Sequence, residues 1–212
     1  MCSCARGREA PDQPKPVVVG GCGSYIVDMN IALRRPFTVE EYLDWAATQR
    51  DLPRTELING QIVAMTPERV EHIEIKVAAV IALKKAIARA GVSCHALGDG
   101  MTVRIDDHTA YEPDALVYCG ERLKRGAMLA RDPVVIVEVL SPTTSHTDTS
   151  AKLIGYFKLP SVHHYLIIDP DACAVAHHSR AANGTVSGHT ITSGTIRLDP
   201  PGLSLDVPEI FE

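Results

Sequence analysis

The segment VVIVEVL, residues 134–140, constrains the fold of this chain more than any other stretch. An apolar, β-branched run of this length is typical of a strand that is buried on both faces near the middle of a sheet. Glu138 interrupts the run with a carboxylate, whose charge is costly to bury without a partner. A metal ion, a basic side chain or a proton could be that partner. We therefore expect a central strand that carries either a functional or a neutralised acid.

A second carboxylate precedes the next apolar segment upstream. Asp114 follows Pro113 and leads into ALVYC, residues 115–119, which has the composition of a strand. An aspartate at the start of one strand and Glu138 within a neighbouring strand can meet across a sheet and offer oxygens to a hard cation such as Mg²⁺. Pro-Asp is also a common turn pair, and Glu138 could be a salt-bridged core residue. The two carboxylates together favour a metal site more strongly than either alone.

Helical and strand patterns alternate along the rest of the chain. Thr38 is a good N-cap, with acidic residues in the turn that follows. Asn59-Gly60 joins two short apolar stretches and suits a type I′ hairpin turn. Residues 66–91 have apolar side chains at three- and four-residue spacing, and 148–158 also reads as a helix. The pattern predicts one mixed β-sheet flanked by helices, in a single α/β or α+β domain.

Length and composition set the expected organisation. The 212 residues suit one domain, with 31–212 as the folded unit and 1–30 as a flexible N-terminal extension. No apolar run approaches the roughly 18 residues of a membrane-spanning helix. The N-terminus also lacks a secretory pattern, so we expect a cytoplasmic protein without membrane contact. Six scattered cysteines with no CxxC pair then argue against disulfides and against a structural zinc site.

Two histidine pairs, at 163–164 and 177–178, flank the turn sequence DPDAC. A hairpin could bring two of these side chains together. Neighbouring histidines alternate faces, however, and no cysteine or acid accompanies them at zinc spacing. We therefore expect these histidines at the surface. The chain also lacks the GxSxG elbow of serine hydrolases and the P-loop of nucleotide-binding proteins.

Several segments resemble the Uma family of restriction endonucleases, a branch of the PD-(D/E)xK nuclease superfamily. They are EPDALVY at 112–118 and VVIVEVLSPTTSHTDTSAKLIGYFKLPSVHHYLIIDP at 134–170, with YLDWA, ELINGQIVAM and Glu71-His72 upstream. The resemblance implies a restriction-endonuclease-like fold. It also implies that Asp114 and Glu138 bind Mg²⁺ or Mn²⁺, with the main-chain carbonyl of Leu140 as a further ligand.

The chain departs from the superfamily motif at one position. That motif has a lysine two residues after the glutamate, where this chain has Leu140. The resemblance implies that Lys152, in the following helix, takes over the work of orienting the attacking water or neutralising transition-state charge. The alternative is that Lys152 only pairs with Asp148 on a solvated helix face. Glu56 matches an acidic position of the family and shares a strand face with Ile58; it is a third acidic candidate, unless it is a simple edge-strand carboxylate.

The resemblance implies metal-dependent hydrolysis of phosphodiester bonds in double-stranded DNA. A homodimer would suit the cutting of both strands, because its two-fold symmetry matches that of the duplex. A catalytically inactive nuclease fold that binds nucleic acid or protein is the alternative, favoured by Leu140 and by the net charge of −5. Retention of three carboxylates with Lys152 favours the enzyme. A β-rich interaction module would leave Glu138 unexplained.

Overall fold

The computed structural model describes residues 35–49, 53–141 and 146–211. Its helices are α1 (Val39–Thr48), α2 (Val70–Ala90), α3 (His146–Tyr156) and α4 (Pro208–Phe211). Its strands are β1 (Thr55–Ile58), β2 (Gln61–Ala64), β3 (Cys94–Gly98), β4 (Thr102–Asp106), β5 (Thr109–Tyr111), β6 (Ala115–Cys119), β7 (Leu129–Ala130), β8 (Pro133–Val139), β9 (His164–Asp169), β10 (Ala174–Arg180), β11 (Val186–Ile191), β12 (Thr195–Leu198) and β13 (Leu203–Asp206).

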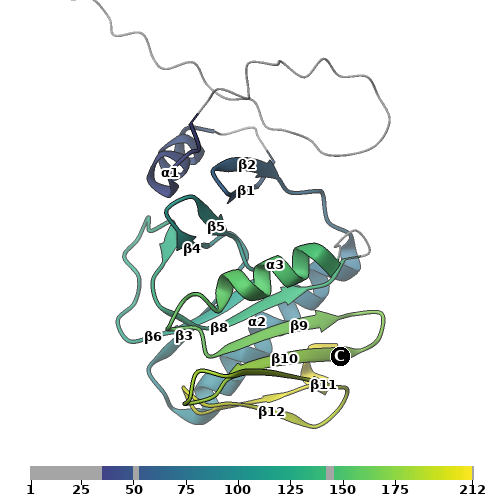
Figure 1. The fold of residues 1–212 in the computed structure, drawn as a ribbon. Helices are drawn as coiled ribbons and strands as arrows, with labels where there is room; N and C mark the ends of the chain where they lie inside the picture. Colours follow the sequence, from purple (N-terminus) through teal and green to yellow (C-terminus); the bar gives the residue numbers. More distant parts are fainter. Residues whose placement is uncertain (1–34, 50–52, 142–145, 212) are drawn as a thin grey trace, which may run out of the picture.

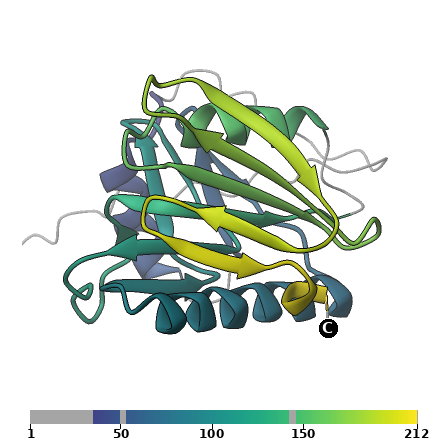
Figure 2. The same ribbon diagram turned by 90° about the horizontal axis from the view of Figure 1, so that it is seen from below.

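The strands divide among several sheets. The largest sheet has the order β11-β10-β9-β8-β6-β3, in which β8 runs parallel to β9 and antiparallel to β6. A smaller sheet has the order β2-β1-β5-β4-β7, and β12 pairs with β13 in a separate hairpin. Helices α2 and α3 lie on opposite sides of the largest sheet (Figures 1 and 2). The mixed sheets and few helices confirm the predicted α+β class. The described strands form separate sheets, however, where we expected a single one.

Strand β8 is buried on both faces, as its apolar sequence predicts. One core cluster contains Val135, Val137 and Val139 together with residues of α2 and of the β12–β13 hairpin. Ile136 belongs to the opposite cluster, together with Tyr156 of α3. Because side chains alternate along a strand, Glu138 points to the same face as Ile136. The fold therefore directs this carboxylate towards α3.

Local signals at the start of the described chain form the expected elements. Thr38 caps α1 in a capping box, in which its hydroxyl accepts from the backbone N–H of Glu41 and the Glu41 carboxylate accepts from that of Thr38. Asn59 and Gly60 join β1 to β2 with φ angles of 50° and 76°, as a type I′ turn requires. A Cβ at Gly60 would lie 2.2 Å from the Cβ of Pro36, so the turn also has no space for a side chain.

Helix α2 begins later than the sequence indicates. Residues 66–69 are not helical, and Arg69 is an N-cap that makes no side-chain capping bond. The non-helical segment brings the carboxylate of Glu68 to the ammonium of Lys76, and this pairing replaces the expected N-terminal turn. The helix ends at Gly91, which has the left-handed conformation expected of a C-terminal cap.

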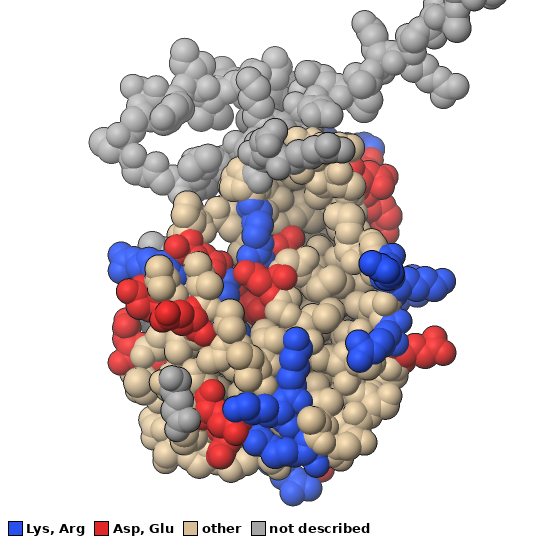
Figure 3. All heavy atoms as spheres, turned by 180° about the vertical axis from the view of Figure 1, so that it is seen from behind, with Lys and Arg blue, Asp and Glu red and all other residues tan. Residues whose placement is uncertain are grey.

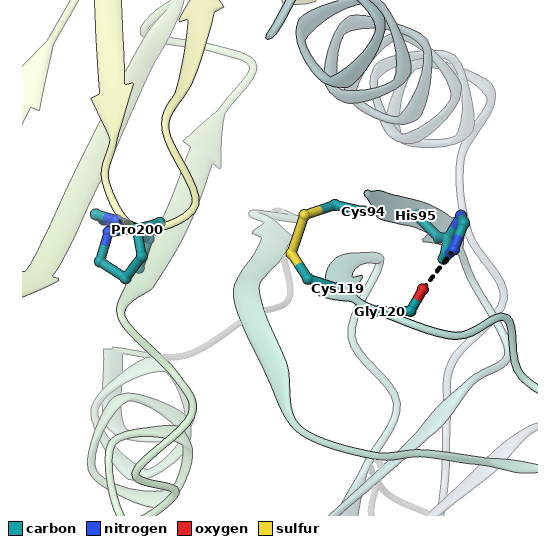
Figure 4. Close-up of a disulfide and its surroundings, with 6 residues drawn as sticks. Cys94, His95, Cys119, Gly120 and Pro200 are labelled. Atoms are coloured by element: carbon teal, nitrogen blue, oxygen red, sulfur yellow. Dashed lines mark hydrogen bonds between the residues drawn. A yellow bond between two sulfur atoms is a disulfide. The ribbon is translucent and has the colours of Figure 1, made fainter. Parts of the chain in front are cut away.

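The expectation that cysteines do not pair is wrong. Cys94 on β3 and Cys119 on β6 form a disulfide (Figure 4). These residues are direct partners in the antiparallel register, and their Cα atoms lie 3.9 Å apart. Register across an antiparallel pair is a long-range property, so the scattered spacing of the cysteines gave no signal of this contact. Cys173 is a free, exposed cysteine, and Cys2, Cys4 and Cys22 lie outside the described residues.

The expectation of surface histidines is wrong for two of the four. His164 and His177 are buried on β9 and β10, with 2.9 Å between Nδ1 of His164 and Nε2 of His177. The hairpin did bring two histidines together, as the sequence allowed. The carbonyl of Pro200, in the loop between β12 and β13, lies 3.0 Å from the other ring nitrogen of His164. This loop covers the pair and removes it from the surface.

The predicted N-terminal extension, 1–30, lies outside the described residues. Among the helices of 35–49, 53–141 and 146–211, none combines the length and the hydrophobicity that crossing a bilayer requires.

Candidate active site

Glu56, Glu138 and Lys152 come together from three elements. Glu138 lies on β8, Lys152 lies on α3, and Glu56 lies on β1 of the smaller sheet. The Lys152 ammonium lies 3.0 Å from Oε1 of Glu56 and 3.1 Å from Oε1 of Glu138. Lys152 and Glu56 are both buried, so neither a solvated helix face nor an exposed edge strand describes them. The side chain of Asp148, the alternative partner, lies outside the described part of α3.

Tyr156 completes this group. It lies four residues after Lys152, on the same face of α3. Its hydroxyl donates a 2.8 Å hydrogen bond to Oε1 of Glu138. The ring is fully buried between Tyr111 and Tyr165. In the sequence, Tyr156 stands out only through the family resemblance, because a tyrosine at an apolar helix position usually belongs to the core.

The environment of Glu138 disfavours its charged form. Burial is the largest cause and raises the pKa of Glu138 to about 8. The negative charges of Asp114 and Glu56 act in the same direction, whereas the Lys152 ammonium and the Tyr156 hydroxyl oppose the shift. Burial and the neighbouring carboxylates thus outweigh the Lys152 ammonium, and Glu138 binds a proton more readily than an exposed glutamate does.

Asp114 lies at the start of β6, beside the end of β8. Ala115 pairs with Val137, and this antiparallel register, extended by one residue, places Asp114 opposite Glu138. The sequence predicted this meeting across adjacent strands. Oδ2 of Asp114 accepts a 2.7 Å hydrogen bond from the backbone N–H of Val139, and Oδ1 lies 2.6 Å from the Lys76 ammonium.

Lys76 is a site residue that sequence reasoning missed. Only 5% of Lys76 is exposed, and its ammonium contacts Glu68, Asp99 and Asp114. These three carboxylates each offer an oxygen, and the oxygens lie within 4.8 Å of one another. Burial lowers the pKa of Lys76, but Asp114 and the other acids outweigh burial and raise it above its usual value. The available signal was a lysine on the same helical face as the core residues Ala79 and Leu83.

Arg54 and Glu112 link the two groups of charges. The Arg54 guanidinium bonds to Asp99 on one side and to Oε2 of Glu112 on the other, at 2.9 Å from Glu112. The backbone N–H of Glu112 in turn donates a 2.9 Å bond to Oε1 of Glu56. A continuous network of ion pairs and hydrogen bonds thus runs from Lys76 to Lys152. Its members come from distant parts of the chain, which sequence periodicity does not relate.

His72 and Leu140 define the backbone at the end of β8. Nε2 of His72 lies 2.8 Å from the carbonyl oxygen of Val139, and the N–H of Val139 is bound by Asp114. The N–H of Leu140 instead donates to the carbonyl of Ile168 on β9. The backbone N–H of Val139 therefore points towards Asp114, and that of Leu140 points towards β9. Leu140 directly follows β8, and the role of its carbonyl as a main-chain metal ligand stays a prediction.

A groove of about 500 Å³ opens beside the Lys76 end of this network. Its charged lining residues are Glu68, Lys76, Lys84, Asp99 and Asp114, and its apolar wall is formed by side chains of α2. Figure 3 views the molecule from the side of α2, where acidic and basic side chains lie next to one another. A second hollow of about 680 Å³ lies at the other end, between His72, Leu140 and Thr149. The carboxylates of Glu68, Asp99 and Asp114 are thus reached through the first groove.

Comparisons with known proteins identify the family and the fold. Residues 39–208 match the family model Uma2, which is described as "Putative restriction endonuclease". An uncharacterised protein of Synechocystis is 27% identical over 174 residues, which cover 81% of this chain and 90% of that protein. A crystal structure from Anabaena variabilis, described as "a putative nuclease belonging to DUF820", has a TM-score of 0.65 and 20% identity over 83% of this chain and 98% of that one. At this identity the structural likeness shows the fold alone.

Proposed function

The chain belongs to the Uma2 family, and from that premise we propose that it is a metal-dependent endonuclease that hydrolyses phosphodiester bonds in double-stranded DNA. One observation carries the proposal. Asp114, Glu138, Glu56 and Lys152 come from four separate elements, yet they converge at one buried end of the central strands. A core without chemistry to perform has no physical need for two buried carboxylates, Glu56 and Asp114, beside a third that is mostly buried, Glu138.

The residues present fit a hard divalent cation. Mg²⁺ and Mn²⁺ take carboxylate oxygens as ligands, and Asp114 lies opposite Glu138 while also belonging to the three-carboxylate group with Glu68 and Asp99. These oxygens attract positive charge, since the Lys76 ammonium forms ion pairs with all three carboxylates of the group. We assign Asp114 and Glu138 as ligands, with Glu56 in support. When bound, the ion would acidify a water, polarise the phosphate and stabilise the leaving oxygen.

The side chains of the network would prepare the site for this chemistry. Lys152 is fixed between Glu56 and Glu138, so its ammonium stays beside the reacting phosphate and can orient water or neutralise developing charge. Tyr156 holds Glu138 by its hydrogen bond. His72 binds the carbonyl of Val139 and so fixes the end of β8 next to Asp114. Such preorganisation keeps reacting groups within the narrow tolerances that catalysis demands.

A catalytically inactive binding module remains the second candidate. The observation that favours it is that the two lysines already pair with the carboxylates within the protein. In this reading the network is structural, and the fold holds nucleic acid or a protein by its surface. The two candidates differ in one respect that can be measured, because only the enzyme requires a divalent cation for its effect on DNA.

The test is cleavage of supercoiled and linear duplex DNA with Mg²⁺ or Mn²⁺. We expect Asp114→Asn and Glu138→Gln to lower the rate by at least about 100-fold, the scale on which the loss of one electrostatic contact in an active site acts. Glu121→Gln, an exposed acid beyond the end of β6, is the matched control and should cleave normally. Melting curves establish that each variant is folded. Normal cleavage by both site variants, or DNA binding by the wild type without any cation-dependent cleavage, would overturn the proposal.

A further inference from the structure

The outward face of α2 carries apolar side chains that the described residues leave exposed. Val70, Ile73, Val77 and Ile81 are 65%, 47%, 53% and 48% exposed. Their spacing of three and four residues aligns them in one stripe along the helix. A solvated helix face normally carries polar residues, and a continuous apolar stripe indicates a surface that binds another protein.

Charges are segregated along the same stripe. Glu74 lies in its N-terminal half, and Lys84 lies in its C-terminal half, seven residues after Val77 and therefore on the same face. Both side chains are exposed. Lys85 adds a second positive charge beside Lys84. A helix with acid at one end and base at the other is complementary to a copy of itself that runs in the opposite direction, and repels a copy that runs in the same direction.

We propose that this stripe is the interface of a homodimer in which two α2 helices pack antiparallel around a two-fold axis. In the register that places Val77 against the partner's Ile81, Glu74 lies against the partner's Lys84. The same pairs recur on the other side of the axis, as an isologous interface requires. The apolar side chains are buried at the centre and the charges complete the rim. A second copy satisfies both the hydrophobic and the electrostatic pattern with residues of this chain alone.

The interface would lie beside the candidate active site. Ile73, Val77 and Ile81 also line the groove that contains Asp114 and Lys76. The partner's helix would therefore border this groove, and both candidate sites would lie next to the dimer interface. Only this consequence rests on the proposed function. The interface itself rests on the exposed stripe and its charges, and a protein without nuclease activity would still form it.

Sedimentation velocity of the full chain tests the interface. We expect a concentration-dependent dimer that is complete by roughly 100 µM, the range in which micromolar affinity saturates. Val77→Arg should give a monomer at the same concentration. Ile154→Arg is the matched control, because Ile154 is an apolar side chain of α3 that is 66% exposed outside the stripe, and it should leave the dimer intact. A monomeric wild type, or loss of the dimer in both variants, would overturn the proposal.

A charge exchange tests the antiparallel register. Glu74→Lys and Lys84→Glu should each raise the dimer Kd by at least about fivefold, because each creates two repulsive contacts across the axis. The double variant restores both contacts with reversed sign and should regain the wild-type Kd. Single variants that dimerise normally, or a double variant weaker than either single one, would contradict the register. Neither result depends on whether the protein cleaves DNA.

Discussion

At the scale of single residues, Lys76 shows how strongly the charges of the site depend on each other. Its buried ammonium forms ion pairs with Glu68, Asp99 and Asp114. We predict that Lys76→Met lowers the free energy of unfolding by about 3 kcal/mol, since it leaves partly buried carboxylates without a counter-charge. Lys85→Met, at an exposed position of the same helix, should change it by no more than about 0.5 kcal/mol. Urea unfolding of the two variants measures the difference, and equal stabilities would contradict this role.

The residues that sequence could identify are those whose chemistry conflicts with their surroundings. Glu138 is an acid within an apolar strand, and Asp114 directly precedes the neighbouring strand β6. The position of the two carboxylates relative to these strands therefore already predicts that they meet. Glu56 and Lys152 needed the family resemblance as well. Arg54 was not identifiable, because its partners lie on other elements and no local pattern relates them. Their catalytic roles stay predictions until activity is measured.

At the scale of elements, the β3–β6 pair is joined covalently. The disulfide between Cys94 and Cys119 closes a loop with a sequence separation of 25 residues. We predict that a reducing agent lowers the free energy of unfolding by about 3 kcal/mol, because a cross-link of this loop length restricts the unfolded chain. Cys173→Ser, at the free and exposed cysteine, should respond to reductant as the wild type does. Identical urea curves with and without reductant would contradict a structural role for the bond.

Elements with local signals were predictable, and their partners were not. The Asn59-Gly60 turn and the C-terminal end of α2 follow from the conformations that these residues prefer. The start of α2 shifted because Glu68 has a tertiary partner, Lys76, that outweighs helix propensity. The division of strands into separate sheets depends on pairing between distant segments, on which short-range periodicity carries no information.

At the scale of the whole molecule, the buried histidines make stability depend on pH. Burial lowers the pKa of His164 to about 4, and burial also lowers that of His177. Unfolded histidines titrate near their usual pKa of about 6.5. Below that pH the unfolded chain binds protons that the folded pair does not bind, so stability falls as the pH drops from about 6.5 to about 4. We predict a loss on the order of 2 kcal/mol for the partly buried pair.

Thermal or urea unfolding across this range measures the slope. His164→Gln should reduce it, because the variant removes the group with the larger shift. His163→Gln, at the neighbouring position, should retain it. A slope that is the same in wild type and His164→Gln would assign the pH dependence to other groups. The histidine pair is held by the loop between β12 and β13, so its protonation reports on the packing of that hairpin against the largest sheet.

The network of the candidate site also has a consequence for how the protein is made. The bond between Lys152 and Glu56 joins positions 96 residues apart, and Glu138 and Asp114 lie between them in the sequence. During synthesis, Glu56, Asp114 and Glu138 all leave the ribosome before Lys152. A nascent chain that stops short of α3 therefore holds its carboxylates without that lysine. If the proposed chemistry is correct, an enzyme able to damage the genome acquires its full site only once translation has passed α3.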